Sequence, residues 1–202
     1  DGSGTTSPLL TLLDPPDLDV GPDGALYVGL ETRPLELLQF AESGADAHRF
    51  ALDNTFQRDL APLPDGRILA VSRIGTGPRV VMIAPEKDPV KLVETTEDTR
   101  NPMTTVGSDR AAMLIGPAAA PDIAVVALNT GRILRRIKTP AVPVSLGASA
   151  DGETLYVAAG GSISAIAIAT GATRQIGAGD SLAVDPDNGD LIVKLDEAAG
   201  FR

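Results

Sequence analysis

The apolar residues of this chain fall into short runs that polar turns separate at regular intervals. A turn built around Asp and Gly is followed at once by strand-forming residues, and this turn–strand motif occurs five times. The five copies span residues 21–30, 63–72, 107–116, 149–158 and 185–194. Their turn aspartates, Asp23, Asp65, Asp109, Asp151 and Asp187, are spaced 42, 44, 42 and 36 residues apart.

This spacing points to one architecture. A hairpin repeated about every 40 residues is typical of a β-propeller, in which small four-stranded sheets called blades form a ring. The pattern therefore predicts an all-β fold of four-stranded antiparallel blades. About five blades are visible, four of them whole and one composite, built from the two ends of the chain.

The fourth repeat shows the predicted blade most clearly. Residues 144–151 and 153–160 are predicted to form its first two strands, joined by an Asp-Gly turn. Residues 162–170 alternate apolar and small side chains and are predicted to form the third strand, and residues 172–179 form a more polar fourth strand. Four strands within one repeat length make one blade.

The other repeats follow the same plan. Their predicted third strands, 35–40, 79–85 and 122–128, are nearly continuous apolar runs, which suit strands buried on both faces. Their predicted fourth strands, 47–53, 90–96 and 132–138, alternate charged and apolar residues. Charge on an outer edge strand prevents it from pairing with other molecules.

The repeats divide residues 1–202, as a single domain, into blades. The predicted blades are approximately 15–57, 58–100, 101–142, 143–179, and a composite of 180–202 with 1–14. Two interpretations of the chain ends stay open. The chain is either a five-bladed ring with a reduced last blade or a segment of a larger propeller, and an open segment would expose sheet faces that favour self-association.

Composition narrows the classes of function. The net charge is −10, which argues against binding to nucleic acid or to anionic membranes. No apolar stretch is long enough for insertion into a membrane. The chain contains one His and no Cys, so we predict no metal site and no cofactor. The basic cluster of Arg132, Arg135, Arg136 and Lys138 is explained by a charged outer strand.

Several segments resemble known propeller repeats. SADGETLYVAAGG (149–161) with ISAIAIATGATRQI (163–176) resembles the YVTN-type repeat, and ALNTGRILRRI (127–137) is similar to its last segment. DVGPDGALYVGL (19–30) resembles NHL and gluconolactonase-like repeats, and the opening DGSG turn is similar to TolB-type repeats. The resemblance implies a bacterial, extracytoplasmic or periplasmic module for interaction or sensing, although fold alone does not fix function.

A docking face follows from propeller topology. The connections from a fourth strand to the next first strand, and from a second to a third strand, lie on one face around the channel, here called the loop face. The polar residues predicted to converge there are Glu31, Arg33, Asp59, Arg73, Arg79, Asn101, Asp180 and Glu197. A rim of mixed charge suits a protein, a peptide or a small polar ligand. The leading hypothesis is therefore a non-enzymatic binding or sensor module.

Two alternatives stay open. A metal-dependent, gluconolactonase-like hydrolase would bind one divalent metal through Glu, Asn and Asp, as the resemblance implies. Glu31, Asn101, Asp59 and Asp180 would supply these groups, although the residues around them do not match that family's motifs. The other alternative is a structural repeat segment of a larger bacterial surface protein.

Overall fold

The computed structural model describes residues 17–22, 26–30, 36–40, 47–51, 56–74, 77–84, 89–185 and 188–195. Within these ranges all regular structure is β-strand, and no helix is long and apolar enough to cross a membrane. Four sheets of four strands and one sheet of two strands follow one another along the chain. The predicted all-β fold of four-stranded antiparallel blades is confirmed.

Each sheet is one blade, and its strands are ordered in space as they are in the sequence. Blade one contains β1 (Asp17–Val20), β2 (Leu26–Leu30), β3 (Glu36–Phe40) and β4 (Ala47–Ala51). Blade two contains β5 (Phe56–Pro62), β6 (Ile68–Ile74), β7 (Gly77–Ile83) and β8 (Val90–Lys91). Blade three contains β9 (Thr99–Val106), β10 (Arg110–Ile115), β11 (Asp122–Ala127) and β12 (Ile133–Ile137).

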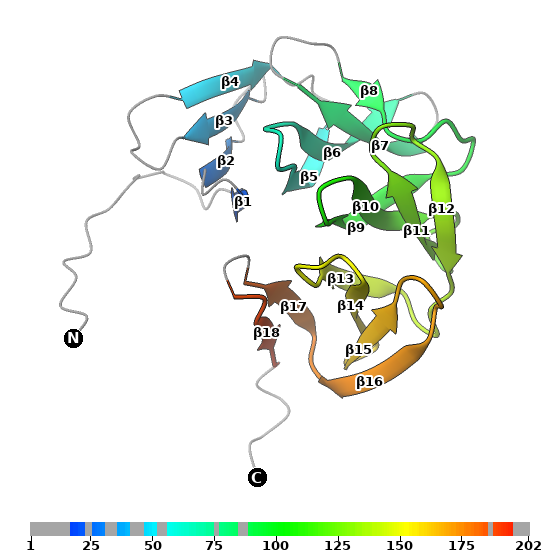
Figure 1. Ribbon diagram of the computed structural model, residues 1–202. Coiled ribbons are helices and arrows are strands. Elements are labelled where there is room, and N and C mark those ends of the chain that lie inside the picture. Colours follow the sequence, from blue (N-terminus) through cyan, green and yellow to red (C-terminus); the bar gives the residue numbers. More distant parts are fainter. Residues whose placement is uncertain are drawn as a thin grey trace, which may run out of the picture.

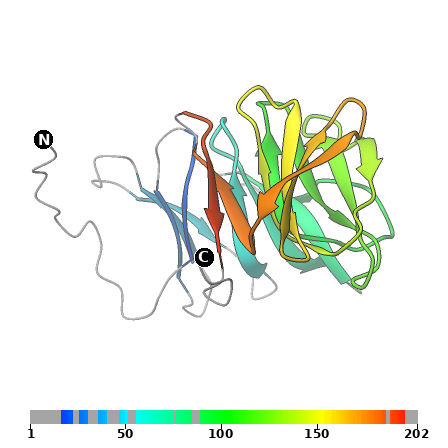
Figure 2. The ribbon, with the colours of Figure 1, turned by 90° about the horizontal axis from the view of Figure 1, so that it is seen from below.

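Blade four contains β13 (Pro143–Ala148), β14 (Thr154–Ala159), β15 (Ser162–Ala167) and β16 (Thr173–Ala178). Blade five is described as two strands, β17 (Ser181–Val184) and β18 (Leu191–Lys194). The blades follow one another around an arc, and the first strands of neighbouring blades contact each other at its inner side (Figure 1). Seen from below, blade five again lies between blade four and blade one (Figure 2).

Two of the turn aspartates, Asp65 and Asp151, cap the hairpins between first and second strands. The Oδ1 atom of Asp65 accepts the backbone N–H of Arg67 at 3.1 Å, and that of Asp151 accepts the N–H of Glu153 at 2.9 Å. In the fifth copy, the Asn188 Oδ1 accepts the N–H of Asp190 at 2.8 Å. Asx turns of this kind explain why Asp and Asn recur at the repeat period.

The hydrophobic core lies between blades rather than within them. The second strands β6 and β10 are buried on both faces over most of their length, and β10 shows how. Its Ala111, Met113 and Ile115 pack against blade two, whereas Ala112 and Leu114 pack against blade four. This arrangement follows from the period of two along a strand, which sends neighbouring side chains to opposite faces. A near-continuous apolar strand therefore joins two blades at once.

The prediction for the outer strand of blade two was wrong in length. Strand β8 spans Val90–Lys91, not residues 90–96. The chain leaves the edge here because Leu92 and Val93 are buried in the core between blades two and three. The Leu92 carbonyl also lies against the turn at Gly131, where an added Cβ would come within 2.1 Å of it.

Blade boundaries and ring closure are described only in part. Strands β5 and β9 begin at Phe56 and Thr99, each two residues before the sequence-based boundary of its blade. Residues 1–14, the predicted outer part of the composite blade, lie outside the described residues, as do residues 196–202. The choice between a closed five-bladed ring and a segment of a larger propeller therefore stays a prediction.

Candidate functional site

The innermost strands of three neighbouring blades each contain a β-bulge in their first half. In β5 the register skips from Gln57 to Leu60, so that Arg58 and Asp59 bulge out. In β9 it skips from Arg100 to Met103, which leaves Asn101 and Pro102 as the extra residues. In β13 the extra residue is Val144. Bulges redirect side chains and are common next to functional sites.

These bulges form one region because their strands are neighbours. Strand β9 contacts β5 on one side and β13 on the other. Each bulge lies near the start of its strand, where the connection from the preceding blade arrives. Their residues therefore border the loop face at the inner side of the arc. This group of Asp59, Asn101 and Val144 is called the bulge row.

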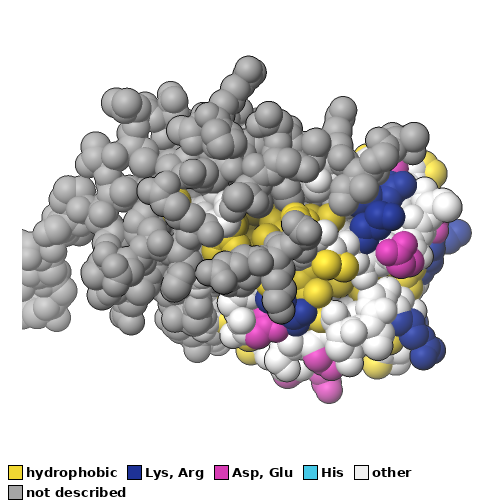
Figure 3. All heavy atoms as spheres, turned by 90° about the horizontal axis from the view of Figure 1, so that it is seen from above, with side chains coloured by type: hydrophobic (Ala, Val, Ile, Leu, Met, Phe, Trp, Pro, Cys, Tyr) yellow, Lys and Arg dark blue, Asp and Glu magenta, His cyan; other side chains and the backbone are white. Residues whose placement is uncertain are grey.

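The bulge row has an exposed apolar end. The Val144 side chain is 60% exposed, and Val142 in the preceding connection is 41% exposed. An exposed valine on an innermost strand contrasts with the neighbouring Leu146, which is buried. On the side of the molecule seen in Figure 3, exposed hydrophobic side chains likewise lie among basic and acidic ones. A partly apolar surface beside polar groups is typical of protein-interaction sites.

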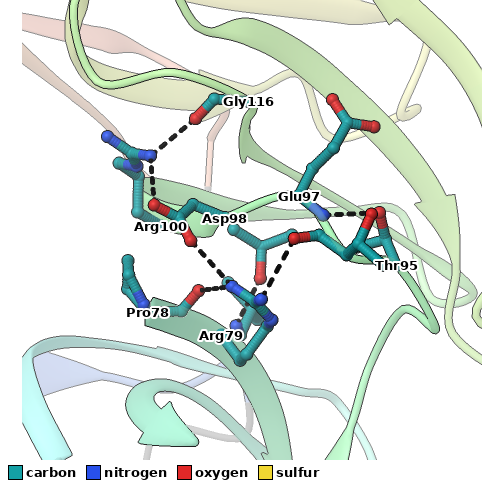
Figure 4. A network of polar contacts seen from close by, with 10 residues as sticks. Pro78, Arg79, Thr95, Glu97, Asp98, Arg100 and Gly116 are labelled. Carbon is teal, nitrogen blue, oxygen red and sulfur yellow. Dashed lines mark hydrogen bonds and ion pairs between the residues drawn. The ribbon is translucent and has the colours of Figure 1, made fainter. Parts of the chain in front are cut away.

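A polar network centred on Asp98, just before Asn101 in the chain, fixes the connection between blades two and three (Figure 4). The Arg79 Nη1 atom, on β7, donates to Asp98 Oδ1 at 2.9 Å, and Nη2 donates to the Thr96 carbonyl at 3.2 Å. Arg100 Nη2 donates to Asp98 Oδ2 at 3.2 Å and to the Gly116 carbonyl at 2.5 Å. Arg79 is only 8% exposed, so this charged group is buried with its acceptors in place.

The network joins the two predicted classes of loop. Asp98 belongs to the connection between blades, and Gly116 begins the connection between β10 and β11. The Gly116 N–H donates to the Asp98 carbonyl at 2.9 Å. The adjoining residues 117–120 are exposed at the surface. Paired side chains and backbone groups thus hold two loops of the loop face in a fixed arrangement.

A second ion pair lies at the outer end of the same connection. Arg136 on β12 makes a two-pronged contact with the Glu97 carboxylate, with its Nη1 donating to Oε2 at 3.1 Å. Hydrogen bonds from Arg136 lower the pKa of Glu97, against the opposing effect of desolvation. Both side chains are 39% exposed. This pair therefore supports the connection more weakly than the buried Arg79 does.

The structure describes the predicted site residues to different extents. Glu31, Arg33 and Glu197 lie outside the described residues. Asp59 and Arg73 lie within strands β5 and β6 rather than in loops, and only their backbones are described. Arg79 lies on β7, Asn101 on β9, and Asp180 is exposed in the connection between β16 and β17.

Of the predicted residues, Arg79 contacts the connection that leads into Asn101, because it donates a hydrogen bond to Asp98 in that connection. Asp180 belongs to the junction of blades four and five, where its N–H donates to the Lys194 carbonyl at 2.9 Å. The convergence of all eight predicted residues stays a prediction. In the part of the chain that the structure describes, no three His, Cys, Asp or Glu side chains are grouped as a metal site would need.

Sequence reasoning did not single out Asp98, Arg100, Glu97 or Val144. Asp98 and Arg100 lie in and just after the connection between blades two and three, but nothing in their order along the chain identifies Arg79 as the partner of Asp98. The basic cluster on β12 was explained by outer-strand charge. In the structure Arg136 reaches Glu97, whereas Arg135 donates to the Ala169 and Thr170 carbonyls of blade four.

Comparison with known proteins gives a fold and no family. Neither a protein-family model nor a curated protein sequence matches this chain. Among solved structures, TolB from Acinetobacter baumannii is similar with a TM-score of 0.68 at 15% identity, over 90% of this chain and 48% of that chain. Putative TolB from Agrobacterium tumefaciens gives a TM-score of 0.62 at 13% identity, over 80% of this chain and 61% of that chain.

A third similar structure comes from a nidogen/laminin complex, with a TM-score of 0.58 at 13% identity, over 79% of this chain and 64% of that chain. The chain thus spans less than two thirds of each of these solved chains. The architecture is of the TolB-like and related β-propeller type, as the sequence repeats predict. At these identities the likeness concerns the fold alone.

Proposed function

We propose that this chain is a non-enzymatic β-propeller binding module that takes an extended peptide segment of a partner protein across the bulge row. The observation that carries the proposal is the series of bulges at Asp59, Asn101 and Val144 on three neighbouring innermost strands. Such a row bends the innermost strands and re-aims their side chains, which gives an extended peptide a shaped surface to lie against.

The chemistry of the row supports a peptide rather than a fully polar ligand. Val144 and Val142 provide an exposed apolar contact, and the partly buried Asn101 lies at the bulge of the neighbouring strand β9. The Asp98 network holds the adjoining loops in place before binding. Preorganised loops lose less conformational entropy on association, which favours binding.

The comparisons support a protein partner in general terms. One of the similar solved structures is a complex between nidogen and laminin, and two others are TolB proteins. An extracytoplasmic location, which the repeat resemblance implies, is part of the proposal.

The test is a binding selection with matched valine variants. Peptides selected on the wild-type protein from a random display library would be measured by calorimetry against Val144→Asp and Asn101→Ala. We expect each change to weaken binding at least about tenfold, which is about 1.4 kcal/mol. Val90→Asp is the control, because Val90 is also 60% exposed but lies on the outer strand β8. Equal affinities for the Val144 and Val90 variants would reject the bulge row as the site.

The non-enzymatic part of the proposal has its own test. Purified protein loaded with a divalent metal would be assayed for lactone hydrolysis before and after treatment with a chelator. We expect no hydrolysis above the uncatalysed rate in either sample. Hydrolysis that the chelator abolishes would support the gluconolactonase-like alternative instead.

A further inference from the structure

Strand β18 presents an edge whose sequence is complementary to itself. Among the described residues, β18 pairs with β17 alone. Figure 1 shows β18 on the side of β17 that faces away from the inner strands. In the segment 190–194, Asp, Leu, Ile, Val and Lys follow one another. When two copies of this segment run antiparallel, Lys194 of one copy can lie opposite Asp190 of the other at each end, with apolar residues between these pairs.

The backbone groups that point outward can be deduced from the pairing with β17. The register pairs Val184 with Leu191 and Leu182 with Val193. The Asp185 N–H donates to the Asp190 carbonyl at 2.8 Å, so Asp190 directs its carbonyl toward the β17 side. Because these directions alternate along an antiparallel strand, the N–H and C=O groups of Leu191 and Val193 point away from β17.

These outward groups limit how a second β18 can pair. Antiparallel partners exchange hydrogen bonds only between residues whose backbone groups face each other. Placing Leu191 opposite Val193 of a second copy satisfies this condition twice, and it sets Ile192 opposite Ile192. Registers shifted by two residues also let the outward backbone groups form hydrogen bonds, but they place Asp190 or Lys194 opposite Ile192.

The side chains favour the same register. In it, each Asp190 lies directly opposite a Lys194, and these pairs flank the two isoleucines on one face of the joined sheet. Ile192 is 60% exposed and Leu195 is 45% exposed, so association would remove apolar surface from water. Opposite charges and apolar pairs directly across a ladder stabilise it, whereas like charges destabilise it.

We propose that β18 pairs edge to edge and antiparallel with β18 of a second copy of this chain, with Ile192 opposite Ile192. The two-stranded sheets of two blades would then form one continuous four-stranded sheet around a twofold axis. This arrangement would pair the outer edge of β18, which among the described residues pairs with no strand but β17. It does not depend on the bulge row, which lies on the innermost strands of other blades.

Charge exchange tests the partner and the register together. The single variants Asp190→Lys and Lys194→Asp each place like charges opposite each other twice in the dimer. We expect sedimentation velocity to show a dimer for the wild-type chain and at least about tenfold weaker self-association for each single variant. Mixing the two single variants should restore a dimer, because every Lys then meets an Asp. The double variant D190K/K194D should also dimerise.

A disulfide test checks the geometry directly, because the chain contains no Cys that could react in the background. Ile192→Cys places two thiols across a non-hydrogen-bonded pair, where the strands approach most closely. With oxidised glutathione we expect a covalent dimer. Val90→Cys, equally exposed on β8, should form little covalent dimer under the same conditions.

Three results would overturn the proposal. The first is a wild-type chain that stays monomeric at its highest soluble concentration. The second is a dimer that neither single charge variant weakens. The third is cross-linking through Val90→Cys that is as efficient as cross-linking through Ile192→Cys. Circular dichroism of each variant would confirm that the fold is retained.

Discussion

The junction between blades two and three differs in construction from the junction between blades four and five. The first packs β6 and β10 in one extended cluster and adds an ion pair between the buried Arg79 and the partly exposed Asp98. The second has a small cluster around Ala158, Ile163 and Leu182. There the Ser145 hydroxyl donates to the Leu182 carbonyl at 2.8 Å, so a neutral hydrogen bond links the inner strands.

This difference implies that the junction of blades two and three is rigid and that the junction of blades four and five is more adaptable. A junction with many buried apolar contacts opens only when the whole domain unfolds, whereas one with few such contacts opens locally. The bulge row is supported by the first kind of junction, and the edge of β18 belongs to the second. We therefore expect the bulge row to be preorganised and the β18 edge to adjust to a partner.

The largest expected difference comes from truncating one core side chain at each junction. Met113 is fully buried between blades two and three, and Leu182 is 8% exposed between blades four and five. Met113→Ala should lower the free energy of unfolding by about 4 kcal/mol, and Leu182→Ala by about 2 kcal/mol. Urea denaturation would measure both values.

Hydrogen exchange would then show where each truncation acts. Leu182→Ala should speed exchange in β17 and β18 while leaving β10 protected, because the junction of blades four and five opens on its own. Met113→Ala should speed exchange in β10 and in both of its neighbouring blades. Equal acceleration throughout the chain for both variants would contradict the proposed difference between the junctions.

The next effect concerns a turn that touches the first junction. Gly131 has a φ of 64°, and an added Cβ would lie 2.1 Å from the Leu92 carbonyl oxygen. Gly131→Ala should cost about 3 kcal/mol, because left-handed strain is added to a displaced backbone. Gly66 has a φ of 79° with nothing within 4 Å of its Cβ position, so Gly66→Ala should cost only about 1 kcal/mol. Similar costs for both would argue against a tight contact at Leu92.

The repeat pattern predicted the blades because their strands and turns depend on local chemistry. The strands of blade four follow the predicted ranges closely, and the caps at Asp65 and Asp151 explain the repeated Asp-Gly turns. The short β8 was missed because Leu92 and Val93 read as an alternating edge strand, and only the neighbouring blade makes their burial favourable.

The candidate site was less predictable for a related reason. Asp59 and Asn101 were chosen as loop residues, yet they lie at bulges inside strands. A bulge depends on how two strands pair, and the residues of one strand do not fix it. Val144 was not chosen because an exposed valine in an apolar strand looks like a core residue in sequence. Its 60% exposure comes from the way blade four pairs.

Breaking the Arg79–Asp98 ion pair should have a smaller effect than the Gly131 change. Asp98→Ala removes the carboxylate that both Arg79 and Arg100 contact, and it leaves the Arg79 guanidinium buried. We expect a loss of about 2 kcal/mol, below the range for fully buried pairs because Asp98 itself is 40% exposed. Arg67→Met, which removes the more exposed contact with Asp65, is the control and should cost less than about 1 kcal/mol. Equal losses would remove the distinction between the network and a surface ion pair.

The smallest expected effect is a pH dependence at the outer end of the same junction. Arg136 lowers the pKa of Glu97 in the folded chain, so the pair stabilises the fold above the unfolded-state pKa of Glu97. That contribution is lost as the pH falls through the lower, folded-state pKa. Because both side chains are 39% exposed, it should amount to a few tenths of a kcal/mol, about the size of a surface pair. The urea midpoint of the wild type should therefore exceed that of Glu97→Gln near pH 7. The difference should shrink once the pH falls below the ordinary carboxyl value of about 4.3, and it should vanish only below the lower folded-state pKa. A difference that persists in acid would show that the carboxylate charge is not what holds this connection to blade three.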